Sequence, residues 1–163
     1  MPTMSLSPRP PIGERLEQLL DQARALFAAR HEIVCAYAFG SRIRGTSSGL
    51  SDLDLAVLTD RHGGSPEKGW QTYWGDLHAR LVKQLALRDD DLDLLILDEV
   101  KDPVIRHRAT WCGRLIFCRD HEARVRFETR VLLRYLDTAY LRKVQEQALF
   151  NWAAGFQGGT GGT

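Results

Sequence analysis

The sequence predicts an α/β (α+β) domain with a small mixed β-sheet flanked by helices. Short apolar runs rich in strand formers alternate with longer segments in which apolar residues recur every three or four positions. With 163 residues, the chain is long enough for one domain with a substantial core and too short for two comfortable ones. Hydrophobic residues at 44% and charged residues at 26% are ordinary for a soluble globular protein.

The first half of the chain predicts two helices and two strands. Leucines at helical spacing predict an amphipathic helix over residues 13–30. An apolar run over residues 32–39, closed by Gly40, predicts the first strand. Residues 41–46 are expected to form a short helical start, followed by a polar loop and a second strand over residues 53–59.

The second half predicts two strands and three more helices. Apolar residues that step by three and four predict a helix over residues 70–85, and a charged turn separates it from a third strand at 92–97. A helix over residues 103–111 and a small strand at 114–118 follow, and a long helix is expected over 121–150. This order suggests helices on one side of the sheet and the functional site on the other.

The last helix is apolar over most of its circumference, which predicts contacts on two sides. Two interpretations remain open. Either another protein chain covers the second side, or the domain's own helices do.

Outside this domain, assigned to residues 12–150, we expect a flexible Pro-rich lead at 1–11 and a disordered Gly/Thr-rich tail at 151–163. The lead has no apolar region typical of a secretion signal, and no apolar stretch approaches the roughly 18 residues of a membrane span. The three cysteines form no Cys-x-x-Cys pair. These features favour a cytoplasmic protein without a membrane partner.

Charge is distributed unevenly along the chain. Residues 51–100 carry 11 acidic and 5 basic side chains, whereas residues 101–163 carry 6 acidic and 11 basic ones. An acidic middle suits a cation site, and a basic C-terminal part suits an acidic partner or nucleic acid. Solvated helix faces of opposite sign would explain the same counts.

One motif carries chemistry. Gly40-Ser41 is followed after ten residues by Asp52-Leu53-Asp54. Because side chains alternate along a strand, Asp52 and Asp54 are expected on one face. Paired carboxylates suit Mg²⁺, which proteins hold together with substrate phosphates. A glycine followed by a small hydroxyl lets backbone N–H groups approach those phosphates.

This spacing resembles the signature of the nucleotidyltransferase superfamily that includes DNA polymerase beta. Gly45 after the turn and Ser51 before the first aspartate make the chain similar to the minimal nucleotidyltransferases, and within them to the MntA antitoxins. The resemblance covers about residues 12–150 and implies a nucleotidyltransferase-type sheet. The MntA antitoxins are partnered with HEPN-domain toxins.

The resemblance implies roles for further residues. Asp93, in the third predicted strand, would be the third metal-site carboxylate and would help to deprotonate the acceptor, although it also continues an exposed acidic run. Asp52 and Asp54 would be catalytic and hold Mg²⁺, and Gly40 and Ser41 would hold the β- and γ-phosphates of ATP. Arg42 or Arg44 would add charge-assisted hydrogen bonds to these phosphates. For each of these two arginines, a solvated position in the loop without a phosphate contact is an equal alternative.

The function implied by the resemblance is transfer of AMP from ATP to a tyrosine hydroxyl of a cognate HEPN ribonuclease toxin, which silences the toxin. The protein would be a Mg²⁺-dependent protein adenylyltransferase in a hetero-oligomer with the toxin, with no direct nucleic-acid binding expected. Two alternatives remain: an antitoxin that acts by binding alone, and a transferase acting on a small molecule such as an aminoglycoside.

Overall fold

The computed structural model describes the backbone of residues 12–46, 52–60 and 69–156, and the side chains as far as Trp152. The predicted lead at 1–11 lies outside these residues. Two 3₁₀ turns and nine regular elements follow one another in the described residues: η1 (Ile12–Arg15), α1 (Leu16–Ala28), β1 (Ile33–Phe39), α2 (Gly40–Ile43), β2 (Leu53–Thr59), α3 (Gly69–Leu85), η3 (Asp89–Asp91), β3 (Leu92–Ile96), α4 (Pro103–Thr110), β4 (Arg114–Cys118) and α5 (His121–Phe156).

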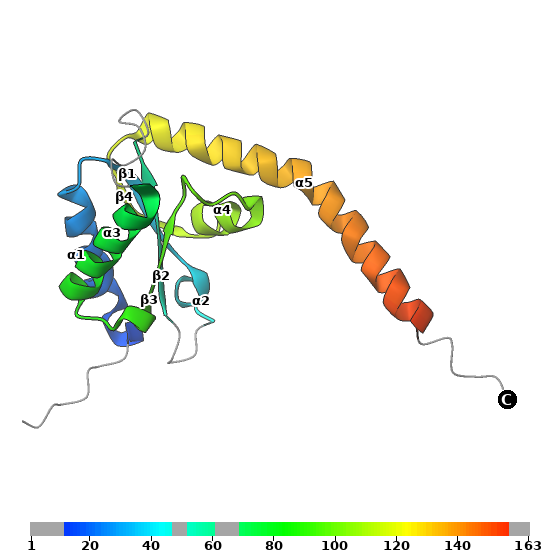
Figure 1. Ribbon diagram of the computed structural model, residues 1–163, viewed down its shortest axis with the longest axis horizontal. Coiled ribbons are helices and arrows are strands. Elements are labelled where there is room, and N and C mark those ends of the chain that lie inside the picture. The colour runs from blue at the N-terminus through cyan, green and yellow to red at the C-terminus, as the bar shows by residue number, and fades with distance from the viewer. Residues whose placement is uncertain (1–11, 47–51, 61–68, 157–163) are drawn as a thin grey trace, which may run out of the picture.

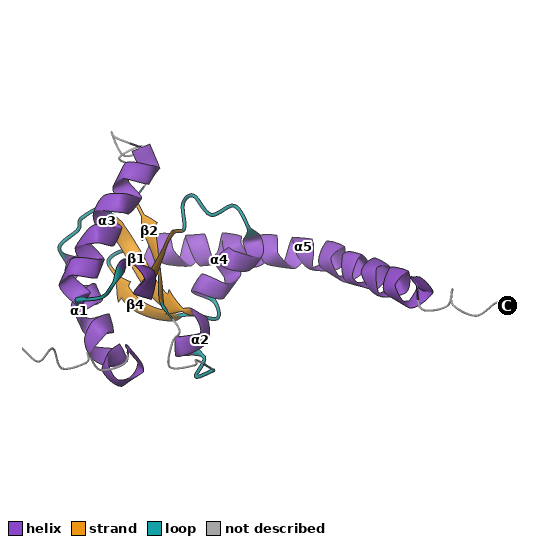
Figure 2. Ribbon diagram, turned by 60° about the horizontal axis from the view of Figure 1, so that its bottom comes forward, coloured by secondary structure: helices purple, strands orange, loops and turns teal. Residues whose placement is uncertain are grey.

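The sheet is mixed, as predicted. Its strand order is β3-β2-β1-β4, and β1 pairs antiparallel with both β2 and β4, while β2 and β3 are parallel. The parallel pair is possible because α3 returns the chain from the end of β2 to the start of β3. The resulting sheet is flanked by helices, which confirms the predicted fold class (Figure 2).

Helices cover both faces of the sheet, contrary to the prediction that they would lie on one side only. On one face, α1 and α3 bury leucines against alternate residues of β1, β2 and β3. On the other, α4 and the first part of α5 cover Tyr37 and Leu58 through Ala109, Phe127 and Val131 (Figure 1). Helical periodicity indicates an apolar face on a segment but not which side of a sheet will receive it.

Specific contacts fix the start of α4 and of α5. Asp102 accepts a hydrogen bond from the Val104 backbone N–H at 2.7 Å and precedes a proline at the first helical position. Asp120 likewise accepts from the Ala123 N–H at 2.9 Å. Such caps satisfy amide groups that the helix itself leaves without a partner.

α5 is anchored near its start and extends far beyond the sheet. Buried Tyr37 donates a hydrogen bond to Glu128 at 2.7 Å, and the rings of His107 and Tyr135 stack with centroids 3.8 Å apart. The later part of the helix extends away from the rest of the domain (Figure 1). It continues to Phe156, six residues into the segment predicted as a tail, and residues 157–163 lie outside the described part.

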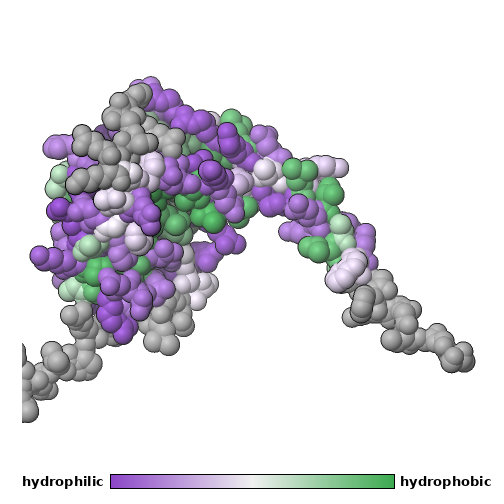
Figure 3. Space-filling view, viewed as in Figure 1, coloured by the Kyte–Doolittle hydropathy of each residue, from purple (hydrophilic) through white to green (hydrophobic). Residues whose placement is uncertain are grey.

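The extended part of α5 is apolar on the surface. Leu133, Leu136 and Tyr140 are 56%, 55% and 73% exposed. Figure 3 shows hydrophobic side chains gathered along this part of the helix. The domain's own described helices therefore do not cover the second apolar side of α5. Among the helices of the described residues, none is long and apolar enough to cross a membrane.

Candidate active site

β1 ends in a turn that only glycine fits. Gly40 has a φ of +80°, a backbone conformation that L side chains rarely adopt. A Cβ atom at this position would also collide with Oδ2 of Asp54 on the neighbouring strand. Gly40 is therefore required both by its own backbone and by the carboxylate beside it.

The turn presents backbone donors. α2 begins at Gly40, and the residue before it, Phe39, gives no side-chain cap. The first backbone N–H groups of α2 have no hydrogen-bond partner within the helix. Half-buried Ser41 stabilises the turn from within, because its carbonyl accepts a hydrogen bond from the Thr46 N–H at 3.0 Å.

Strand register brings two of the predicted aspartates together. Asp54 in β2 lies beside Asp93 in the parallel strand β3 and opposite Phe39 in β1. Their neighbours Leu53, Leu55, Leu92 and Leu94 are buried on the α1 and α3 side, so both carboxylates point to the opposite face. Asp52, two residues before Asp54, is exposed and lies immediately before the first residue of β2.

The electrostatics indicate that these groups act on one another. Burial raises the pKa of Asp54 to about 6, and the nearby carboxylates of Asp93 and Asp52 add to this rise, while Arg42 and Arg44 oppose it. A carboxyl group with such a pKa is partly protonated near pH 6. A cation bound here would remove the repulsion and favour the ionised form.

Arg42 has a structural contact that the sequence did not predict. Its side chain is buried, and its Nε donates a hydrogen bond to the backbone carbonyl of Asp52 at 3.2 Å. This contact ties α2 to the start of β2. Arg44 is exposed at the end of the turn. Ser51, the other polar residue of the motif, lies outside the described residues.

The donor set suits a hard divalent cation. Carboxylate oxygens are the ligands that Mg²⁺ prefers, and Asp54, whose pKa is raised first by burial and then by Asp93 and Asp52, lies among such oxygens. As they stand, however, no three His, Cys, Asp or Glu side chains of the described residues form a cluster able to hold a metal ion. Asp54 and Asp93 could therefore contribute ligands to a cation, but the described side chains do not form a complete coordination shell.

The contact between Gly40 and Asp54 had no signal in the sequence, because it depends on the pairing of β1 with β2. The proximity of Asp93 had a partial signal: an acid at an alternating position in an otherwise apolar strand. Register then decides which acid of the run 89–93 faces Asp54.

Comparison with known proteins agrees with this geometry. A sequence profile described as polymerase beta, nucleotidyltransferase matches residues 21–122, which contain the turn and all three aspartates. No curated protein matched the sequence of the chain.

Solved structures share the fold. A chain of a crystal structure described as a toxin-antitoxin with AMP-PNP aligns with a TM-score of 0.58 at 19% identity, covering 85% of this chain and 98% of that one. A chain of a structure described as the toxin-antitoxin MntA-HepT aligns with a TM-score of 0.54 at 17% identity, covering 85% and 96%. At these identities the likeness shows a common fold.

Proposed function

The chain belongs to the polymerase beta nucleotidyltransferase family, and we propose that it transfers AMP from ATP to a hydroxyl group of a partner protein. The observation that carries the proposal is the position of Asp54, packed against Gly40 of the turn and beside Asp93 of the next strand. The turn proposed to bind phosphate therefore lies directly beside two of the carboxylates proposed to bind a cation, which supports a single site.

In the proposed mechanism, the amide groups of Gly40 and Ser41 bind the terminal phosphates of ATP. Asp52, Asp54 and Asp93 would hold Mg²⁺, which would supply positive charge to stabilise the attacking and leaving oxygens. The acceptor oxygen forms a bond to the α-phosphorus as the bond to the β-phosphate oxygen breaks, and pyrophosphate leaves. Exposed Asp93 accepts the proton of the acceptor hydroxyl.

Arg42 has a structural contact in addition to its predicted role at the phosphates. Because its Nε bonds to the Asp52 carbonyl, Arg42 positions the start of β2. Exposed Arg44 is the better candidate to reach the triphosphate.

A protein acceptor is favoured by the surface of α5. Leu133, Leu136, Tyr140 and Val144 are separated by three, four and four residues and lie on one side of the helix. This side is opposite Phe127 and Val131, which are buried against the sheet. An apolar stripe of this kind fits a groove on another protein.

The partner that fits the proposal is a small helical HEPN-type toxin, with a tyrosine as the acceptor. The likeness to structures described as MntA-HepT supports this choice. The reaction would add a bulky, charged group to the toxin and so silence it.

The proposal is tested with ATP labelled on its α-phosphate, Mg²⁺ and lysate of the source cell. Label on a small protein, absent when the Asp52→Ala/Asp54→Ala double variant replaces the protein, would support it. Label in small molecules only would favour an enzyme of the aminoglycoside type. A partner that co-purifies with both forms and takes up no label would indicate an antitoxin that acts by binding alone.

A further inference from the structure

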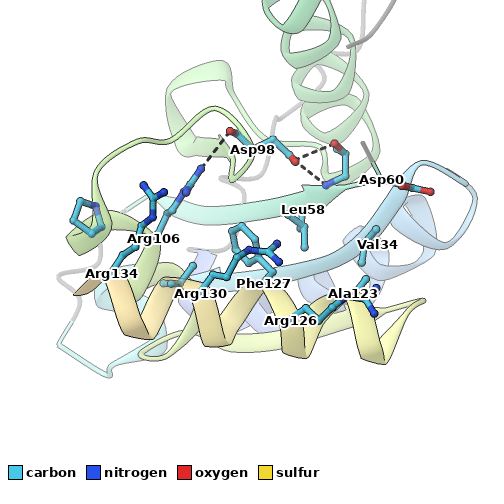
Figure 4. A pocket seen from close by; sticks show the side chains of 13 residues that line it. Val34, Leu58, Asp60, Asp98, Arg106, Ala123, Arg126, Phe127, Arg130 and Arg134 are labelled. Carbon is cyan, nitrogen blue, oxygen red and sulfur yellow. Dashed lines mark hydrogen bonds between the residues drawn. The ribbon is translucent and has the colours of Figure 1, made fainter. Parts of the chain in front are cut away.

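A second concave site lies at the other end of β2. Thr59 and Asp60 border a cavity of about 380 Å³ between the sheet, α4 and the first part of α5 (Figure 4). Thr59 is five residues from Asp54, a separation of about 17 Å along a strand. The cavity is thus distinct from the candidate active site, and nothing in the proposed mechanism uses it.

The cavity combines an apolar floor with an arginine rim. Val34, Leu58, Phe127 and Val131 form part of the floor. The four basic side chains that line it are all arginines: Arg106, Arg126, Arg130 and Arg134. Its volume is in the range of small binding sites, which begins at about 300 Å³.

Arg106 is held in place at the back of the cavity. It donates hydrogen bonds to the carbonyl oxygens of Leu97 at 3.2 Å and Asp98 at 3.3 Å. Its guanidinium also lies over the ring of Phe127, 5.6 Å from the centroid. A cation fixed in this way loses little side-chain entropy when it meets an anion.

The other three arginines form a row along α5. They recur every fourth residue, so successive positions are about 6 Å apart along the helix. Arg126 forms an ion pair with Glu122. Within the described part of the chain, the guanidinium groups of Arg130 and Arg134 have no hydrogen-bond or ion-pair partner, and both side chains are exposed.

In the described residues, neither of the two acids that line the cavity, Asp60 and Asp98, pairs with Arg130 or Arg134. Asp98 is 9% exposed and its Oδ2 accepts hydrogen bonds from the Thr59 N–H at 2.9 Å and the Thr59 hydroxyl at 3.0 Å. Asp60 lies at the edge (Figure 4). With four arginines and two aspartates, the lining of the cavity carries a net positive charge.

We propose that this cavity and the arginine row bind a single-stranded nucleic acid. A line of cations beside an apolar floor matches a ligand with anionic groups at regular intervals and flat rings whose faces can pack on apolar side chains. Arginine suits phosphate groups because its planar fork donates two parallel hydrogen bonds. A polyglutamate segment has the charges but no flat group for the floor. This proposal departs from the sequence-based expectation of no direct nucleic-acid binding.

The test measures fluorescence anisotropy of a labelled single-stranded RNA of about 12 nucleotides titrated with the full chain. The Arg130→Ala/Arg134→Ala variant removes two cations of the row. The Lys83→Ala/Arg108→Ala variant is the control, since it removes two exposed charges that do not line the cavity. All forms are checked by thermal melting and by their transfer activity, which neither variant should change.

We expect the row variant to weaken RNA binding at least about tenfold and the control to leave it unchanged. Loss of two phosphate contacts should also reduce the slope of log K against log salt by about 1.4. Equal RNA affinity in all three forms, or no RNA binding by the unaltered protein, would overturn the proposal. Competition by polyglutamate or by ATP as effective as that by unlabelled RNA would overturn it as well, in favour of an acidic peptide or a mononucleotide.

Discussion

The substitution Asp54→Asn separates the stability cost of the site from its function. The folded protein raises the pKa of Asp54 from 3.8 to about 6, chiefly through burial and then through Asp93 and Asp52. The folded state thus favours the protonated carboxyl group. The contribution of the protonated Asp54 to stability is present in full below the ordinary pKa, and it is lost as the pH rises through about 6.

A rise of this size corresponds to at most about 3 kcal/mol when the group is fully ionised. Asp54 is only half-buried, so water screens the repulsion, and we expect a cost of about 1 kcal/mol at pH 8. Asparagine keeps the shape of the side chain and removes the charge. Asp54→Asn should therefore raise the free energy of unfolding at pH 8 by about 1 kcal/mol and the Tm by about 2–4 °C.

The assay is thermal unfolding followed by circular dichroism in the presence of EDTA, at pH 8 and at pH 4.5. At pH 4.5 the difference in Tm between Asp54→Asn and the unaltered protein should be smaller than at pH 8, because the folded protein then protonates most of Asp54. The difference should vanish only below the ordinary pKa, where the unfolded chain protonates this group as well. Asp89→Asn, which removes an exposed carboxylate away from the site, should have little effect at either pH. A Tm difference that is the same at both pH values, or a lower Tm for Asp54→Asn at pH 8, would refute the reasoning.

Three further results are expected. Gly40→Ala should reduce stability by about 1–3 kcal/mol in urea unfolding and abolish transfer, since the new Cβ requires a strained φ and collides with Asp54; unchanged transfer would contradict this role. Asp93→Asn should lower the transfer rate at least about 100-fold in a label-transfer assay, because Asp93 is in register with Asp54. Asp90→Asn, the control, should leave the rate unchanged. Equal rates for the two variants would show that Asp93 does not belong to the site. Tyr140→Glu should abolish co-purification of the partner without a change in the Tm of the isolated protein, because this side chain is 73% exposed; a partner retained at full yield would place the interface elsewhere.

Local features of the sequence predicted the elements well. The strands end where glycine or charged residues interrupt apolar runs, and β1 and β2 begin and end within one residue of the prediction. β3 stops at Ile96, one residue early, and the next residue, Leu97, still donates a backbone hydrogen bond to Val57. The exposure of Asp93 could also be predicted, because an acid in an apolar strand is unlikely to be fully buried without a partner.

Features that depend on long-range packing were not predictable. The sequence did not indicate that α4 and α5 cover the second face of the sheet, since an apolar helix face is compatible with either side. Nor did it indicate that Arg42 is buried, because its hydrogen-bond partner Asp52 lies ten positions further along the chain. Contacts of this kind follow from the meeting of separate segments rather than from any one segment.

The most direct test of the central claim compares two isotopic labels. The protein, Mg²⁺ and the co-purified partner are incubated with ATP labelled on either the α- or the γ-phosphate, and protein-bound label is measured. The account predicts label from the α-phosphate only, with none in the Asp52→Asn/Asp54→Asn double variant. Protein-bound label from the γ-phosphate, or α-label undiminished in the double variant, would contradict nucleotidyl transfer at this site.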